Sequence, residues 1–313
     1  MNKSGPMKTA AIVGVDIGGS HITAGLVNIN DRTVFNDTII RKWVDPHGPV
    51  ERIISAWGDV IKQVAAVFEG KAFRVGIAMP GPFNYESGIS LIKGFNKYEA
   101  LYGLNVKEML ATYIGITAAD IKLKNDAAAF LQGEVFCGAA AGYKRPAGLT
   151  IGTGLGSASM KTEETEECAV NVSPLHGDIA EAYISIRWFL KRYQQLSGQP
   201  AKEVKQLAEA ATHDVWAAQV FREFTANLAI VLKRFIAEEQ PDIVVIGGGI
   251  ANAYDLFYPP LGELLQDTIG HTVIKRSLLG ETAAIAGAAC CWTSAHIDTL
   301  PEQNNQQTTN RYL

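Results

Sequence analysis

Two glycine-rich turns and an aspartate between them are the residues of this 313-residue chain that could carry chemistry. The turns lie in DIGGSHITAGLV (16–27) and IGTGLGSASM (151–160), and Asp126 lies in LKNDAAAF (123–130). Consecutive glycines leave backbone N–H groups unshielded, so that several can bind one phosphate. A carboxylate near a helix N-terminus stays ionised and can accept the proton of an alcohol. The combination predicts phosphoryl transfer to a hydroxyl group, which depends mainly on positioning and charge stabilisation.

At the first turn, Asp16 lies at the end of an apolar strand, separated from the glycines only by Ile17. A carboxylate there could hold hydrated Mg²⁺ beside a phosphate, and we expect Asp16 to be the magnesium residue. The nucleotide-binding residues expected in this segment are Asp16, Gly18, Gly19, Ser20 and Thr23. Gly-Gly between two strands is also an ordinary hairpin turn, which is the alternative for this segment taken alone. A dinucleotide fingerprint is excluded because residues 22–27 alternate like a strand, not a helix.

The other expected nucleotide contacts come from two further glycine runs. The second turn offers backbone N–H groups and one hydroxyl from Gly152, Thr153, Gly154 and Gly156. The third run, Gly247, Gly248 and Gly249 in IVVIGGGIANA, separates a predicted strand from a predicted helix. It could leave flat space for an adenine or ribose, or it could serve only close helix-to-strand packing. Asp126 likewise has a structural alternative, as the N-cap of the helix that follows it.

Composition and charge exclude several classes of protein. The net charge is −4 and no dense Lys/Arg cluster occurs, so we expect no nucleic-acid partner. The polar start MNKSGPMK is no signal peptide, and no apolar run approaches the roughly 18 residues of a membrane span. The four cysteines, at 137, 168, 290 and 291, are spaced neither as a disulfide framework nor as a zinc knuckle. These features predict a cytoplasmic protein with reduced thiols and no membrane partner.

The elements that must position these residues follow an α/β pattern in two halves, and the length favours two domains. Each half begins with a strand, a glycine turn and a returning strand, about 136 residues apart, which indicates a duplication. The first half is predicted as strands 10–27 and 33–43, helix 50–68, strand 73–78, helix 106–113 and strand 121–124. The second is predicted as a helix after Asp126, strands around 151–160, helices 178–194, 201–210 and 214–239, strand 242–246, helix 255–268, strand 272–275 and helix 281–292. The polar segment 297–313 is expected to be disordered.

With these motifs in order, the chain resembles the ROK family, the repressors and sugar kinases related to hexokinase and actin, over nearly its whole length. The resemblance comprises the first phosphate motif (16–23), the sugar-domain loop GIAMPG (76–81), Asn96 in KGFNKY with 104–110, the pair Asn125-Asp126, the second phosphate motif (152–156), the adenosine motif (247–249) and the closing helix ETAAIAGA (281–288). It implies two ribonuclease-H-like (actin/hexokinase-type) domains with a central cleft. These are a small N-terminal domain, 1–125 with the C-terminal helix 281–296, and a larger domain, 126–280.

The resemblance also implies ATP and Mg²⁺ as cofactors, closure on the sugar before transfer, and a homodimer. It implies that the sugar contacts are Gly81, Asn96, Asn125, Asp126, His176 and Glu181. Side-chain amides and carboxylates suit a polyol, because each hydroxyl both donates and accepts.

Two family motifs are missing. The zinc module CxCGxxGCxE does not occur between 160 and 182, so no structural zinc is expected. The Glu-x-Gly-His sugar motif is not recognisable, because His176 follows Ser173-Pro174-Leu175. Repressor members carry a DNA-binding domain before the first strand, whereas about nine residues precede it here, which favours a kinase.

The expected activity is therefore ATP-dependent phosphorylation of a hexose, with the 6-hydroxyl of glucose as acceptor and Asp126 as general base. The alternatives within the enzyme class are N-acetylmannosamine, N-acetylglucosamine, fructose or allose as substrate, and polyphosphate as donor. Outside it they are a non-catalytic sugar-sensing regulator, and an acetate-kinase-like or actin-like ATPase.

Overall fold

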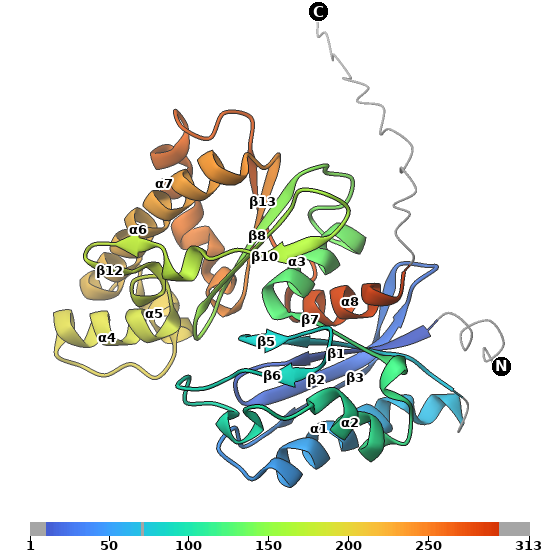
Figure 1. Cartoon of the computed structure of the whole chain (residues 1–313). Helices are drawn as coiled ribbons and strands as arrows, with labels where there is room; N and C mark the ends of the chain where they lie inside the picture. The colour runs from blue at the N-terminus through green and yellow to red at the C-terminus, as the bar shows by residue number, and fades with distance from the viewer. Residues whose placement is uncertain (1–10, 70–71, 294–313) are drawn as a thin grey trace, which may run out of the picture.

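The computed structural model describes residues 11–69 and 72–293, and these contain two five-stranded sheets of the same design (Figure 1). The first has the order β3-β2-β1-β4-β7, and the second has the order β10-β9-β8-β13-β14. In each sheet, the first three strands of the chain pair antiparallel in sequence. The remaining two strands of each sheet run parallel to its first strand, β1 or β8. The strands of the first are β1 (Ala11–Ile17), β2 (His21–Asn28), β3 (Thr33–Trp43), β4 (Val75–Met79) and β7 (Ile121–Asn125). Those of the second are β8 (Pro146–Ile151), β9 (Leu155–Met160), β10 (Thr165–Glu167), β13 (Ile243–Gly247) and β14 (Val273–Arg276).

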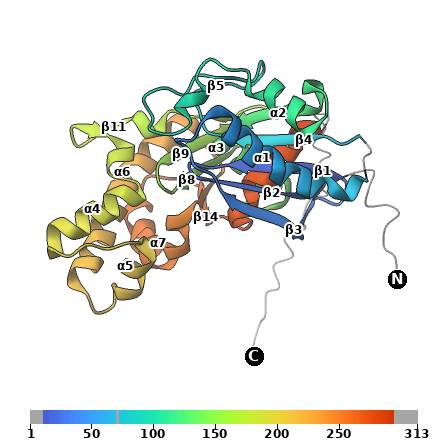
Figure 2. The same ribbon diagram turned by 90° about the horizontal axis from the view of Figure 1, so that it is seen from below.

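Helices cover both faces of each sheet (Figures 1 and 2). On the first sheet, α1 (Val50–Ala65) and α2 (Val106–Ile114) cover one face and α8 (Ala283–Ala289) covers the other. On the second sheet, α3 (Asp126–Cys137) covers one face. Its other face carries α4 (Ile186–Ser197), α5 (Val204–Ala210), α6 (Val215–Glu239) and α7 (Tyr254–Leu265). An apolar stripe of α6, from Val220 to Phe235, is buried there.

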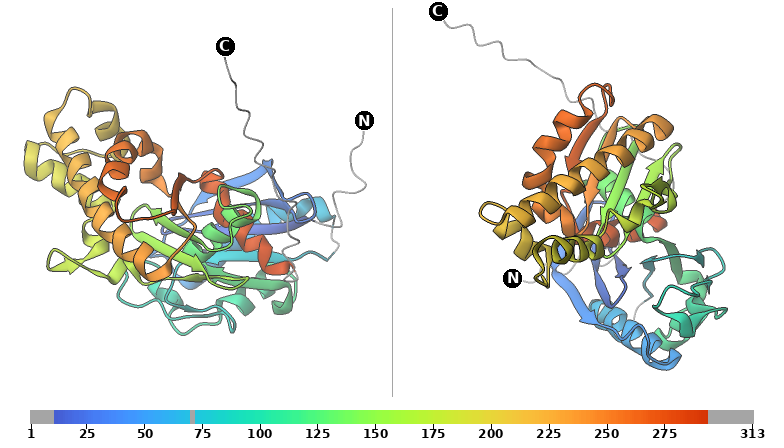
Figure 3. Two further views of the ribbon diagram at one scale, coloured as in Figure 1. Left: turned by 90° about the horizontal axis from the view of Figure 1, so that it is seen from above. Right: turned by 90° about the vertical axis from the view of Figure 1, so that its left-hand side faces the viewer.

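The structure thus confirms the predicted α/β fold of two actin/hexokinase-type halves. Figure 3 shows the two sheets in separate lobes, with α3 and α8 packed together between them. We propose the domain division expected from the sequence, 1–125 with the closing helix against 126–280, because α8 packs on β1 and β4. Residues 294–296 of that helix, and the segment 297–313 expected to be disordered, lie outside the described residues.

Secondary structure differs from the prediction mainly between residues 178 and 194. The expected single helix is instead a short strand, β12 (Asp178–Ile179), a 3₁₀ turn (Ala180–Ala182) and then α4. Gly177, with φ of 86°, turns the chain so that β12 pairs with β11 (Pro174–Leu175). Ser185 then begins α4 by accepting the Trp188 N–H. The closing helix is also shorter than predicted, since 3₁₀ turns flank α8 on both sides.

Glycines allow α3 and α8 to cross at close range. A β-carbon on Gly287 would lie 1.7 Å from the carbonyl oxygen of Ala129, and one on Gly133 would lie 2.0 Å from that of Ala283. We expect Gly287→Ala to lower the free energy of unfolding by about 3 kcal/mol, because two helix backbones would have to separate. Thermal denaturation would show this as a loss of roughly 6–12 °C in Tm.

The matched control is Gly262→Ala in α7, where no atom lies within 4 Å of the added methyl. That change should leave Tm unchanged or raise it, since alanine favours the helix. A Gly287→Ala protein as stable as the control would show that the crossing is not close-packed.

Candidate active site

The predicted catalytic pair lies where β7 ends and α3 begins. Asn125 caps α3: its Oδ1 accepts the N–H groups of Ala127 (2.9 Å) and Ala128 (3.1 Å). The N-cap role considered for Asp126 therefore belongs to Asn125. Asp126 is the first residue of the helix, and one of its carboxylate oxygens accepts the Ala127 N–H at 2.9 Å. The helix start is thus held by Asn125, and the Asp126 carboxylate is not required to cap it.

Asp16 and Asp126 are close enough for their charges to repel. Burial raises the pKa of Asp126, opposed by the nearby Lys97 ammonium and by the helix amides. Burial, and next to it the charge of Asp126, raises the pKa of Asp16 to about 7, with Arg41 opposing the rise and Glu281 adding to it. A pair of partly desolvated carboxylates is a donor set that a hard divalent cation fits. Asp16 therefore suits Mg²⁺, which would also relieve the repulsion.

The first glycine turn leaves two amides available. The Gly18 N–H donates to the carbonyl of His21 (2.9 Å), so it is used within the hairpin, contrary to its expected role as a phosphate donor. The N–H groups of Gly19 and Ser20 donate to no other atom of the described residues. Tyr98 stabilises the turn, because its hydroxyl donates a hydrogen bond to the Gly18 carbonyl oxygen at 2.9 Å. Thr23 is buried, opposite Asp16 in the β1–β2 ladder.

The second turn lies against α3. A β-carbon on Gly156 would lie 3.0 Å from the Ala127 side chain, so the turn and the Asp126 corner are neighbours. The Gly152 N–H is used within the turn, donating to the Gly154 carbonyl at 2.9 Å. Thr153 is exposed at the tip. The β9 end of the turn is thus a neighbour of the first residues of α3.

The glycines of the third run differ in their surroundings: two are closely packed against other residues, and one has open space beside it. A β-carbon on Gly247 would strike the Phe130 ring at 2.4 Å, and one on Gly248 would lie 2.5 Å from the Ile151 carbonyl oxygen. Gly248 also has a φ of 83°. These two glycines are required by packing, which is the structural alternative. Gly249 is exposed, and a β-carbon on it would meet only the Ile186 side chain, at 3.5 Å, so of the three it suits a nucleotide contact best.

Around Asn125 the structure adds two residues that the sequence did not single out, Tyr85 and Glu167. Asn125 Nδ2 donates to the Tyr85 hydroxyl (3.2 Å), which donates in turn to the Met79 carbonyl (3.1 Å). A β-carbon on Gly81 would lie 3.1 Å from that hydroxyl and 3.9 Å from a carboxylate oxygen of Glu167. Burial and the Asp126 charge raise the pKa of Glu167, and a hydrogen bond from Asn125 opposes this. Gly81, Tyr85, Asn125, Asp126 and Glu167 therefore form one polar group.

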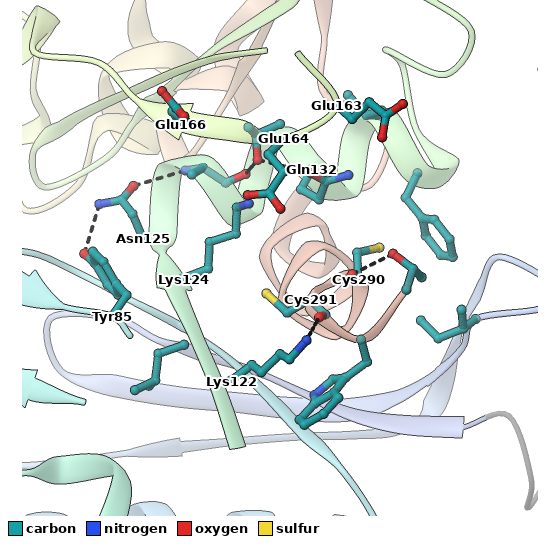
Figure 4. Close-up of a pocket in the computed structure, with 18 of the residues that line it drawn as sticks. Tyr85, Lys122, Lys124, Asn125, Gln132, Glu163, Glu164, Glu166, Cys290 and Cys291 are labelled. Carbon is teal, nitrogen blue, oxygen red and sulfur yellow. Dashed lines mark hydrogen bonds between the residues drawn. The ribbon is translucent and has the colours of Figure 1, made fainter. Parts of the chain in front are cut away.

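Three members of this group, Tyr85, Asn125 and Glu167, line one end of a groove of about 1050 Å³ between β7 and the β9–β10 hairpin, whereas Gly81 and Asp126 do not line it. Figure 4 shows Tyr85 and Asn125 at that end, and Lys122, Cys290 and Cys291 at the other. Lys124 points across the groove toward Glu164. The groove leaves room for a small ligand beside the polar group.

The other predicted sugar residues fall in three different places. Asn96 is exposed on a loop whose next residues are Lys97 and the buried Tyr98. The Tyr98 hydroxyl is hydrogen-bonded to the first turn, which holds this loop near Asp126. The charge of Lys97, which opposes the rise of the Asp126 pKa, indicates the same proximity. Glu181 instead lies on the second turn, where it accepts the Leu155 N–H at 3.0 Å.

His176 is not brought to this group. It lies at the tip of the β11–β12 hairpin, its Nε2 is 2.9 Å from Asn227 Oδ1 on α6, and its ring packs on Tyr183. Figure 1 places the hairpin, labelled at β12, on the side of the second lobe away from β7. The expectation that His176 contacts the sugar is therefore not supported by the structure. The tight turn at Gly177 directs His176 toward α6, and the sequence analysis did not predict this turn.

Within residues 11–69 and 72–293, no group of three or more His, Cys, Asp or Glu side chains could hold a metal ion. The absence of a structural zinc stays a prediction. We expect elemental analysis of purified protein to find less than about 0.1 zinc per chain, because no closed four-ligand set is available. EDTA should leave Tm unchanged while abolishing ATP-dependent turnover, which excess Mg²⁺ should restore. Stoichiometric zinc, or unfolding by EDTA, would contradict this prediction.

In the described part of the chain no helix is both long enough and apolar enough to cross a bilayer.

Comparisons with known proteins identify the family of this chain. The ROK family model matches residues 12–165 and 163–295. A glucokinase from Thermotoga maritima is 30% identical over 327 aligned positions, which cover 90% of this chain and 97% of the relative. An N-acetyl-D-glucosamine kinase from Mannheimia succiniciproducens is 24% identical and covers 89% of this chain and 98% of its own.

A solved structure of a ROK family glucokinase from Streptomyces griseus, in complex with glucose and AMPPNP, superposes with a TM-score of 0.76 at 21% identity. It covers 90% of this chain and 98% of its own. A ROK family transcriptional regulator also superposes, with a TM-score of 0.72 at 17% identity, covering 90% of this chain and 78% of its own. The fold is thus common to kinases and regulators, and the family model decides membership: the chain belongs to the ROK family.

Proposed function

We propose that this chain transfers the γ-phosphate of ATP to a hexose, with the 6-hydroxyl of glucose as the acceptor. Its assignment as a sugar kinase rests on family membership and on full-length similarity to a glucokinase and to N-acetylglucosamine kinases. One structural observation carries the proposal. Asp126 lies at the corner between two glycine turns, beside Asp16 on one side and the polar group of Asn125 and Glu167 on the other.

In this arrangement each side chain has a distinct task. Asn125 and Glu167 would hold sugar hydroxyls, with Gly81 leaving space for the ring and Asn96 reaching from its loop. Asp126 would accept the proton of the reacting hydroxyl as the oxygen–phosphorus bond forms. The amides of Gly19, Ser20, Thr153 and Gly154 would bind phosphate oxygens, and Gly249 would leave room for the adenosine. Mg²⁺ at Asp16 would neutralise phosphate charge.

Glucose is preferred over its N-acetylated relative because the most similar relative named above is a glucokinase. N-acetylglucosamine, N-acetylmannosamine and fructose remain the alternative substrates. Four free cysteines suit a reducing compartment, and we place the enzyme in the cytoplasm. A homodimer remains an expectation from the family resemblance.

The second candidate is a sugar-sensing regulator without turnover, since a regulator shares the fold. A coupled assay of ADP release, with MgATP and a panel of glucose, N-acetylglucosamine, N-acetylmannosamine, fructose and allose, separates the two. Turnover with glucose at the highest kcat/KM supports the proposal. Sugar binding by calorimetry without turnover on any sugar would favour the regulator, and ATP hydrolysis independent of sugar would favour a plain ATPase.

A further inference from the structure

Arg187, in the first turn of α4, lies beside two of the glycine runs that we assign to the nucleotide. The N–H of its neighbour Ile186 donates to the Gly152 carbonyl at 2.8 Å, so α4 begins directly on the second turn. The Ile186 side chain also lies 3.5 Å from the position of a β-carbon on Gly249, in the third run. The start of α4 therefore bridges the surface between the second turn and the adenosine position.

The Glu181 carboxylate links Arg187 to the second turn. One oxygen of Glu181 accepts from Arg187 Nη2 at 2.6 Å, and the other accepts the Leu155 N–H at 3.0 Å. The second oxygen would lie 2.6 Å from a β-carbon on Gly154, so only glycine permits this approach. A backbone N–H and a guanidinium, converging on one anionic group, are also the donors that proteins use for phosphate.

A nucleotide phosphate at this turn would meet the negative charge of Glu181. At hydrogen-bond distance from the same donors, two anions repel each other strongly when partly desolvated. The Arg187 side chain is 66% exposed, whereas that of Glu181 is 25% exposed, so the guanidinium can turn without disturbing the core. The repulsion is avoided if the Glu181 side chain moves away and the phosphate accepts the hydrogen bonds of the Leu155 N–H and the Arg187 guanidinium in its place.

We propose that Arg187 binds a phosphate group of the nucleotide, and that the Glu181 carboxylate holds that place in the nucleotide-free protein. This inference rests on the proposed use of a nucleotide, but it adds a phosphate-binding cation that neither the glycine motifs nor the polar group around Asn125 contains. It also accounts for the position of Glu181 on the second turn.

Nucleotide binding by calorimetry tests the inference without requiring turnover, using the Mg²⁺ complex of AMPPNP as the probe and the full chain. Arg187→Met should raise Kd about tenfold, since a charge-assisted hydrogen bond is lost. Arg187→Lys should raise it only about threefold, because the charge remains but the planar fork does not. Glu181→Gln keeps the shape without the charge, and should lower Kd about threefold or more.

The matched control is Arg192→Met, on the same helix. Arg192 pairs with Glu223 of α6 through two hydrogen bonds of 2.6 and 2.9 Å, and it contacts none of the glycine runs. Its replacement should leave Kd unchanged, and the Tm of each variant reports whether the chain is folded.

The outcomes distinguish this inference from the proposed function. If the unaltered chain binds no nucleotide, both the inference about Arg187 and the proposed function are wrong. Normal binding by the unaltered chain, with Arg187→Met equal to Arg192→Met within twofold, removes only the role of Arg187. A weaker affinity in Glu181→Gln would show that Glu181 supports the nucleotide, and would overturn the exchange between carboxylate and phosphate.

Discussion

Replacing Asp126 by asparagine is expected to lower kcat by a factor of about 10³ or more, while the sugar still binds with a Kd within about threefold of the original. Asparagine keeps the size and most hydrogen bonds of the side chain, but it cannot accept the proton of the reacting hydroxyl. The helix start should survive, because Asn125 and not Asp126 caps α3. ADP release measures the first effect, and calorimetry with glucose measures the second.

The stability of this variant helps to exclude a folding defect. Burial raises the pKa of Asp126, so its charge opposes folding at neutral pH. Asp126→Asn should therefore have a Tm equal to or above that of the original protein. Asp214→Asn is the control, since Asp214 caps α6 through the N–H groups of Trp216 and Ala217. Asparagine caps a helix equally well, but it lacks the carboxylate that accepts the Tyr193 hydroxyl at 2.7 Å and whose pKa that contact lowers, so the change should leave kcat unaltered and lower Tm slightly. A kcat for Asp126→Asn within tenfold of normal would identify another group as the base.

The sequence was sufficient for the architecture because its repeat is local. Strand, glycine turn and returning strand follow one another within about 20 residues in each half, and alternation of apolar residues shows where each strand lies. The order β3-β2-β1-β4-β7 and its counterpart then follow from one duplicated plan. Asn125 and Asp126 could be found for the same reason, since a strand-to-helix junction is a local feature.

The parts of the site made by distant segments could not be predicted in this way. Glu167 lies in the run TEETEE, which has the composition of a solvated loop, and only the pairing of β10 with β9 brings it beside Asn125. Lys97 affects Asp126 because Tyr98 fixes its loop to the first turn, a contact across 80 residues. Conversely, His176 was chosen by residue type, and the Gly177 turn directs it toward Asn227 instead. Tertiary contacts, which sequence spacing does not encode, decided all three cases.

Replacing Asp16 by asparagine is expected to have opposite effects on activity and stability. The pKa of Asp16 is about 7 in the folded chain, against 3.8 as its ordinary value, so the folded state binds a proton that the unfolded state has released between these pH values. The free energy of unfolding contributed by this group therefore falls as pH rises from 4 to 7. Asp16→Asn should be more stable than the original by about 4 kcal/mol at pH 8, and equally stable at pH 3.5.

The activity of Asp16→Asn should fall about 100-fold in kcat/KM, because a neutral amide holds Mg²⁺ and its bound phosphates less well. In the unaltered enzyme, kcat/KM should decline as the pH falls below about 7, when Asp16 takes up a proton. The variant should lack this decline and keep only the loss of activity at lower pH that comes from protonation of Asp126. Asp37→Asn, an exposed carboxylate on β3, is the control and should reproduce the original profile.

Magnesium connects the two effects in one measurement. A cation bound to the native state stabilises it by mass action, so MgAMPPNP should raise the Tm of the unaltered protein and reduce its loss of stability between pH 4 and 7. Asp16→Asn should gain much less from the same addition. If instead both proteins respond equally to MgAMPPNP, Asp16 does not carry the metal, and the charge of Asp16 must serve the reaction in another way. The buried carboxylate would then cost stability without the cation that explains its presence at the end of β1.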